Sequence, residues 1–142
     1  MKRRDTLLRL KRFKVDELKR RLATLDEMKA DLDKKLSDLD DTVAREKLRA
    51  NDSDIGRLAF PSFLQSIDVR RKNIRNTMKD LERERAQVQD DMTVAFQDLK
   101  SFEVAEEERV RRAEEAESRA GQTRLDEMAI VRHLRKHAGR PI

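Results

Sequence analysis

Two histidines and several acidic residues are the side chains in this sequence whose types and spacing could support chemistry. His133 and His137 lie four residues apart, so on a helix they would share one face and could chelate a metal ion. No third histidine or carboxylate stands at a helical offset that would close such a site, and protein metal sites use at least three ligands. We therefore expect both histidines to be exposed on a basic helix face, and we predict no metal and no cofactor.

The acidic residues lack the surroundings that catalysis requires. Asp40 with Asp41 and the run 106–108 fall in densely charged stretches, where no cleft is expected to make them unusually reactive. The sequence contains no Gly-rich phosphate-binding loop and no Cys, which removes disulfides and the usual zinc clusters. We expect no enzymatic activity, and a protein that acts by contacting other proteins.

The composition limits the scaffold that can position any of these residues. Charged residues make up 44% of the 142 positions and the AVILMFWYC set makes up 37%, with no Trp and no Tyr. Such a chain cannot fill a thick core, but it can bury a thin seam between helices. Because the apolar residues recur at helical spacing and Gly and Pro are few, an all-α fold is predicted.

A first helix is predicted over residues 5–50, with Asp5 as its N-cap. Its apolar residues alternate three- and four-residue steps over about five heptads, which is the spacing of a coiled-coil seam. Lys11 and Lys29 interrupt this seam, whose members are Leu8, Val15, Leu18, Leu22, Leu25, Leu32, Leu36, Leu39 and Val43. The polar residues after position 50 predict a connector over 51–61.

A second helix is predicted over residues 62–137, because Ser62 and Gln65 follow Pro61 with the spacing of a capping box. Arg71 and Arg85 interrupt its seam, whose members are Ile67, Ile74, Met78, Leu81, Val88, Met92, Ala95, Leu99 and Phe102. Residues 103–120 are rich in Glu, Arg and Ala, and Gly121 marks a candidate hinge. Gly139 and Pro141 are expected to stop the helix.

Two seams joined by one connector predict a long antiparallel two-helix coiled-coil hairpin with an overhanging C-terminal helix, forming a single unit over 1–142. The second helix is the longer one, so its C-terminal part would lack a partner. That part contains the apolar residues Leu125, Met128, Ala129, Val131 and Leu134. An exposed apolar face of this kind indicates an interaction surface.

The positive charge of the chain is concentrated near its start. The net charge is +5, whereas residues 1–21 alone hold ten Lys and Arg against three acidic residues, a local +7. Antiparallel folding would bring these residues toward the basic stretch 132–140, and so favour a negatively charged partner there. Nucleic acid is a rival partner, but no stacking aromatic residue or known motif accompanies the charge.

Anionic lipid is a second rival partner for the start of the chain. Leu7, Leu8, Leu10 and Phe13 lie among Lys and Arg residues, as in helices that bind membrane surfaces. This stripe is short and continues into the coiled-coil seam, so a seam role is preferred. No run approaches 18 apolar residues, and no membrane-spanning segment is expected.

Several segments of the chain together resemble one family. They are the basic amphipathic start, Asp5 to Phe13 and Val15 to Leu18, the segment Ser62 to Ile67 and the segment Leu125-Asp126-Glu127-Met128-Ala129. With a hairpin of this length, they resemble the FliJ family of flagellar type III export proteins over nearly the whole chain. Ser62 to Ile67 is similar to the family's segment for contacting the export gate.

The resemblance implies a cytoplasmic protein, peripheral at the flagellar basal body, that links the export ATPase hexamer to the cytoplasmic domain of the membrane export gate. It also implies handling of empty export chaperones and membrane association through these partners. The expected export-gate contacts are Phe63 and Ile67. The expected ATPase-ring contacts are Leu125, Met128, Val131, Leu134, Arg132 and Arg135. A generic coiled-coil adaptor and a basic nucleic-acid-binding coiled coil are the alternatives.

Overall fold

A computed structural model describes residues 2–138, which form two helices, α1 (Lys2–Ala50) and α2 (Asp54–Ala138), with no strand in this range. The all-α prediction is confirmed. The chain divides into two compact units, residues 1–97 and residues 98–142, so α2 contributes to both. The expectation of one coiled-coil unit over 1–142 stays a prediction.

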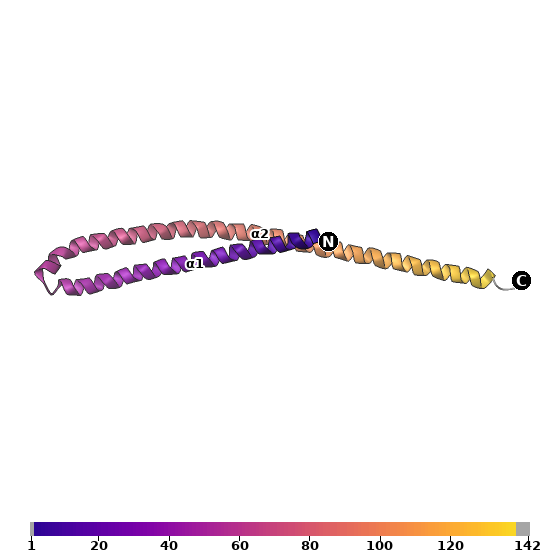
Figure 1. The fold of residues 1–142 in the computed structure, drawn as a ribbon, viewed down its shortest axis with the longest axis horizontal. Helices are drawn as coiled ribbons and strands as arrows, with labels where there is room; N and C mark the ends of the chain where they lie inside the picture. The colour runs from indigo at the N-terminus through magenta and orange to yellow at the C-terminus, as the bar shows by residue number, and fades with distance from the viewer. Residues whose placement is uncertain (1, 139–142) are drawn as a thin grey trace. The chain divides into compact units, whose positions relative to one another are not determined.

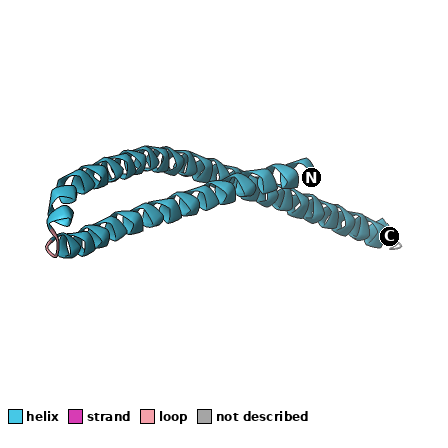
Figure 2. Ribbon diagram, turned by 60° about the vertical axis from the view of Figure 1, so that its left-hand side comes forward, coloured by secondary structure: helices cyan, strands magenta, loops and turns pink. Residues whose placement is uncertain are grey.

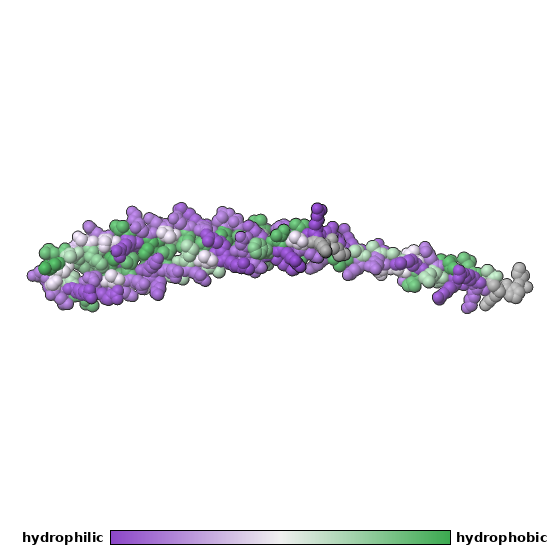
Figure 3. All heavy atoms as spheres, viewed as in Figure 1, coloured by the Kyte–Doolittle hydropathy of each residue, from purple (hydrophilic) through white to green (hydrophobic). Residues whose placement is uncertain are grey.

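The first unit is an antiparallel hairpin, in which α1 and the first half of α2 lie side by side (Figure 1). Every residue predicted to form the seam is buried or half-buried, in both helices. The best-packed cluster consists of Leu25, Leu81 and Val88, with Leu18, Leu22 and Leu32 packed against it. Apolar residues lie along the line between the two helices, and hydrophilic residues cover most of the remaining surface in view (Figure 3). The three- and four-residue spacing therefore predicted the core correctly.

The two arginines that interrupt the second seam form ion pairs across the hairpin. Arg71 Nη2 lies 2.6 Å from Asp40 Oδ1, and Arg85 Nε lies 2.7 Å from Asp26 Oδ1. Arg21 of α1 pairs with Glu84 of α2 in the same way. Each arginine reaches an acidic residue of the facing helix, so a charged side chain is accommodated next to a thin core without burial of an unpaired charge.

The predicted helix boundaries near the turn were wrong. The connector spans only residues 51–53, and α2 begins at Asp54, eight residues before the predicted start at Ser62. Ser53 is the actual N-cap, because its Oγ accepts a hydrogen bond from the backbone N–H of Gly56 at 2.9 Å. Helix α1 begins at Lys2, so Asp5 lies within its first turn instead of capping it.

Helix α2 continues through Pro61, which had been expected to precede the helix. Proline has no N–H to donate to the carbonyl four residues earlier, and its ring crowds that carbonyl, so a proline inside a helix bends it. Figure 2 shows the first turns of α2 bent away from the direction of the turns that follow. The bend lets a helix that starts at Asp54 lie alongside α1 after a connector of only three residues.

The second unit contains the rest of α2. The helix runs without interruption through Gly121, and a hinge at that residue stays a prediction. From residue 110 to residue 138 every residue except Gly121 is exposed. The described helix ends at Ala138, and the predicted stop signals Gly139 and Pro141, with Arg140 of the basic stretch, lie outside the described residues.

Candidate interaction surfaces

The hairpin tip is held by a close approach between the end of α1 and the start of α2. A Cβ atom at Gly56 would lie 3.0 Å from Ala50 Cα and 2.8 Å from Ser53 Oγ. Ala50 is buried at this contact, although it is the last residue of its helix. A side chain at position 56 would therefore have to displace the N-cap or separate the two helices.

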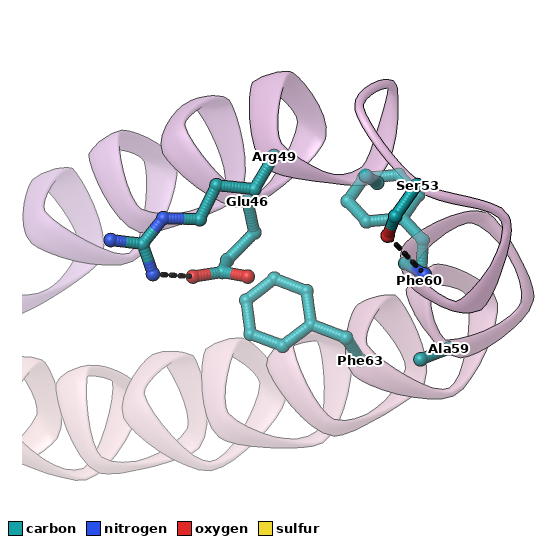
Figure 4. Close-up of a pocket in the computed structure, with 8 residues that line it drawn as sticks. Glu46, Arg49, Ser53, Ala59, Phe60 and Phe63 are labelled. Carbon is teal, nitrogen blue, oxygen red and sulfur yellow. Dashed lines mark hydrogen bonds and ion pairs between the residues drawn. The ribbon is translucent and has the colours of Figure 1, made fainter.

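A cavity of about 340 Å³ opens beside this contact, between the two helices. Two aromatic rings form one wall, with the centroids of Phe60 and Phe63 6.2 Å apart and their planes inclined by 28°. In Figure 4 the ring of Phe63 extends from α2 toward Glu46 of α1. Glu46 is paired with Arg49, whose Nη1 lies 3.4 Å from Glu46 Oε1. The cavity thus combines an aromatic wall with a charged rim, which suits insertion of a small apolar side chain from another protein.

The two residues predicted to contact the export gate have different environments. Phe63 is half-buried and lines the open cavity. Ile67 is only 1% exposed. It lies in the seam, of which the sequence also predicted it to be a member. A partner could reach the side chain of Ile67 only after the helices separate, and a gate contact at Ile67 stays a prediction.

Ile55 and Leu58 form an apolar surface that was not found in the sequence. They are 81% and 82% exposed, the highest values among the large apolar side chains described. Because they lie three residues apart in the first turns of α2, they share a face. Figure 3 shows apolar residues gathered at the tip. The two residues were missed because residues 51–61 were predicted to be a connector. A cap at Ser53 followed by apolar residues at helical spacing could have indicated a helix start there.

The second unit contains a series of ion pairs along α2, defined here as the ion-pair ladder, residues 106–119. Glu108 Oε1 lies 2.5 Å from Arg111 Nη2 and 3.2 Å from Arg112 Nε. Glu115 continues the ladder, with Oε1 3.0 Å from Arg111 Nη1 and Oε2 3.6 Å from Arg119 Nη2. Pairs three and four residues apart stabilise a helix that has little apolar area to pack.

The ladder changes the ionisation of its own members. The hydrogen bond from Arg111 lowers the pKa of Glu108, and the charges of Arg111 and Arg112 add to this effect against the opposing influence of partial burial. The hydrogen bond to Glu108 and the negative charge of that carboxylate in turn raise the pKa of Arg111. The carboxylate form of Glu108 is therefore specifically stabilised in the folded helix.

The predicted ATPase contacts lie beyond the ladder, and four of them form the C-terminal apolar stripe, defined as Leu125, Met128, Val131 and Leu134. Their side chains are between 46% and 62% exposed. Successive members are three residues apart, so each lies about 60° around the helix from the last, and the stripe winds about halfway around α2. Ile130, which sequence reasoning did not single out, is exposed one turn before Leu134 and widens the stripe. Arg132 and Arg135 are exposed in the same segment.

The histidine pair lies in this segment too. The ring centroids of His133 and His137 are 4.2 Å apart and the rings are inclined by 78°, and both residues are exposed. Within residues 2–138 no group of three or more His, Cys, Asp or Glu side chains is arranged to hold a metal ion. Within the described residues, a metal ion at this pair would therefore have only the two histidines as ligands.

A comparison with known protein families identifies the family to which this chain belongs. The sequence profile described as "Flagellar FliJ protein" matches residues 1–138. The chain belongs to the FliJ family. It is therefore a flagellar export-related protein, of a family that is a non-catalytic component of the export apparatus. No curated protein and no solved structure matches the chain significantly.

Membership in the FliJ family implies that the exposed surfaces contact components of the flagellar export apparatus. Neither described helix has an apolar stretch long enough to cross a bilayer. The tip cavity, the Ile55–Leu58 surface and the C-terminal apolar stripe are thus the main candidate contacts of this FliJ family protein with other components.

Proposed function

We propose that this FliJ family protein links the export ATPase hexamer to the cytoplasmic domain of the export gate, acting in the cytoplasm at the flagellar basal body. The observation that carries the proposal is the C-terminal apolar stripe, which stays exposed in a segment of α2 where no residue from 122 to 138 is even half-buried. Exposed apolar patches rimmed by charged residues commonly mark protein interaction sites, which supports a contact role for the stripe. Handling of empty export chaperones, and membrane association through partners, follow from the family resemblance.

The stripe suits the ATPase ring because of its geometry and charge. Its members wind around the helix, so they can contact more than one subunit of a ring that surrounds them. Arg132 and Arg135 lie among them and make no ion pair with any residue in the described range. A partner that offers apolar pockets flanked by acidic residues would satisfy both features.

The hairpin tip is the proposed contact for the export gate. Phe63 and Phe60 wall an open cavity, and Ile55 with Leu58 add a second apolar area on the same end of the first unit. Aromatic residues that become fully desolvated on binding commonly dominate the energy of protein interfaces. Ile67 supports this surface from the seam and does not take part in the contact directly.

The test of the ATPase contact uses hydrolysis and oligomer size of the export ATPase, measured with and without this protein. The substitutions Met128→Asp and Leu134→Asp place charge on the stripe, while Ser118→Asp adds the same charge at an exposed position outside it. We expect the stripe variants to lose stimulation and ring assembly and Ser118→Asp to retain both. Truncation after residue 120 should have the same effect as the stripe variants and leave the hairpin folded.

Undiminished stimulation by the folded truncated protein would reject the ATPase contact. Failure of the intact protein to bind the ATPase, together with binding to unrelated coiled-coil proteins, would favour a generic adaptor. Salt-sensitive binding of random DNA without ATPase binding would favour the nucleic-acid alternative.

A further inference from the structure

The start of α1 has an outer face that the hairpin seam does not use. Leu8 and Val15 turn into the seam, where they are half-buried and buried respectively. Leu10 and Phe13 are instead 58% and 57% exposed, and Leu7 is exposed beside them. The apolar stripe that the sequence analysis assigned to the seam is thus divided, and most of it faces solvent.

Helical geometry places this outer face opposite the seam. At about 100° per residue, Leu10 lies about 140° around α1 from Val15, and Phe13 lies about 160° from it. A flat surface could therefore approach Leu10 and Phe13 without disturbing the contacts of the hairpin. Leu7 lies on the border between this face and the seam.

Basic side chains surround the same face. Lys14 follows Leu10 by four residues, and Arg9 precedes Phe13 by four, so each cation lies beside an apolar residue. Arg3 lies on the Leu10 side, two turns earlier. These three cations are exposed, and none forms an ion pair within residues 2–138. Their charges are thus available to an anionic surface.

We propose that the outer face of residues 3–14 binds directly to membranes that contain anionic lipid. Leu10 and Phe13 insert at the boundary between headgroups and acyl chains, and Arg3, Arg9 and Lys14 contact the lipid phosphates. Long basic side chains can lie along an apolar surface and still keep their charge at the phosphates. This interaction goes beyond the proposed function, in which membrane association arises only through protein partners.

The chemistry of the face favours lipid over nucleic acid. Nucleic acid would engage the cations, but it offers nothing to an exposed leucine, and Phe13 is the single aromatic residue of this segment. An anionic bilayer engages both kinds of side chain. Because only two or three apolar residues insert, the charges are essential, and binding is reversible and falls steeply with salt.

Vesicle co-sedimentation of the full chain tests the proposal, with phosphatidylcholine vesicles that contain either no phosphatidylglycerol or about one third of it. We expect binding to the anionic vesicles alone. Replacing Leu10 and Phe13 by Ser should weaken it at least about tenfold, because the apolar insertion is lost while all charges remain. The matched control replaces Val94 and Phe96, two similarly exposed residues of the same unit, by Ser, and this variant should bind within about twofold of the wild type.

A spectroscopic readout separates insertion from simple charge attraction. The chain has no Trp, so Phe13→Trp introduces a single reporter whose emission should shift to shorter wavelength on anionic vesicles. Phe96→Trp should show no shift. Circular dichroism should be unchanged in all these variants, because each replaced side chain is exposed.

Three outcomes would overturn the proposal. They are absence of binding to anionic vesicles, wild-type binding by the Leu10 and Phe13 double variant, and binding of single-stranded DNA but not of vesicles. None of these measurements involves the ATPase or the gate, so their failure would leave the proposed function standing.

Discussion

Arg85 of α2 donates a hydrogen bond from Nε to Asp26 Oδ1 of α1 at 2.7 Å, from a position within the apolar seam. The bond to Asp26 and the charge of that carboxylate raise the pKa of Arg85. Arg71 makes the equivalent bond to Asp40 at 2.6 Å. The arginines are 14 residues apart on α2 and the aspartates are 14 residues apart on α1, so both pairs specify one and the same antiparallel register.

The first prediction follows from this pairing. Charged residues at seam positions commonly specify register and oligomeric state at a cost in stability. Arg85→Leu should therefore raise the melting temperature by a few degrees and also promote association between chains, since the lengthened apolar seam can pair with a second copy. Thermal melts with light scattering measure both effects.

Arg83→Leu is the control for that experiment, because Arg83 lies two residues away on the exposed side of α2. It should change neither property appreciably. A lower melting temperature for Arg85→Leu, with no change in the association state of the protein, would mean that the ion pair contributes more to the stability of the hairpin than to its register.

The second prediction compares two glycines in the same helix. Gly121 has nothing within 4 Å of the place where a Cβ would stand, so Gly121→Ala should raise helix stability by about 1 kcal/mol. Gly56→Ala gains the same propensity, but its methyl group meets Ala50 and the capping Ser53. We therefore expect Gly56→Ala to lower the melting temperature of the hairpin, because the two helices must separate at the tip to make room for the methyl group.

Circular dichroism melts of both variants check the comparison, and proteolysis near residues 51–53 reports whether the tip has opened. Equal stabilisation by both substitutions would show that the close approach of the helices at Gly56 has little energetic importance. The comparison is internally matched, since the chemical change is the same at both positions.

The third prediction concerns the ion-pair ladder and pH. The pKa of Glu108 is lower in the folded helix than in the unfolded chain, so protons bind preferentially to the unfolded state as the pH falls. The stabilisation by Glu108 is fully present above the ordinary pKa of a glutamate, about 4.3, and is lost as the pH falls through the lowered value. Helicity of the full chain should therefore decline below about pH 4.

Two variants identify the contribution of the ladder to this titration. Glu108→Gln should lower helicity near neutral pH and reduce the loss at acid pH. Glu114→Gln, at an exposed position without an ion pair in the described range, should follow the wild type. High salt should affect the wild type more than Glu108→Gln, because it screens the pairs. Identical acid titrations of all three proteins would contradict this role of Glu108.

The sequence predicted the hairpin core well because a seam has a simple physical signature. Leu25, Leu81 and Val88 fall at coiled-coil spacing, and that spacing decides which side of each helix is buried. The start of α2 could not be found in the same way. Pro61 locally favours a helix start and competes with the weaker cap signal at Ser53, and the contact between Gly56 and Ala50 shows that the helix already packs before Pro61.

The interaction surfaces were predicted less completely, since exposure depends on how segments pack. The C-terminal apolar stripe was predicted because the second helix is longer than the first, so no part of the first helix was left to cover the stripe. Ile55 and Leu58 were missed because a connector has no defined faces. Ile67 was assigned to a partner although the seam buries it, and the sequence alone held both explanations open.

The last prediction separates the two roles at the hairpin tip. Ile67 is almost fully buried in the seam, so Ile67→Ala leaves a cavity and should destabilise the hairpin by about 2–5 kcal/mol, with loss of helicity on mild heating. Phe63 stands at an open cavity, and Phe63→Ala should leave the melting temperature close to that of the wild type. If the tip contacts the export gate, Phe63→Ala should weaken gate binding at least about tenfold, as loss of an aromatic anchor does.

Val69→Ala is the matched control, because Val69 is exposed on the outer face of α2 just beyond Ile67. Isothermal titration with the gate's cytoplasmic domain, carried out at a temperature where all variants have equal helicity, gives the comparison. Weakened binding by Ile67→Ala under those conditions, with Phe63→Ala binding normally, would place the contact in an opened seam. Normal binding by both variants would remove the cavity from the interface and leave Ile55 and Leu58 as the apolar contact of the tip.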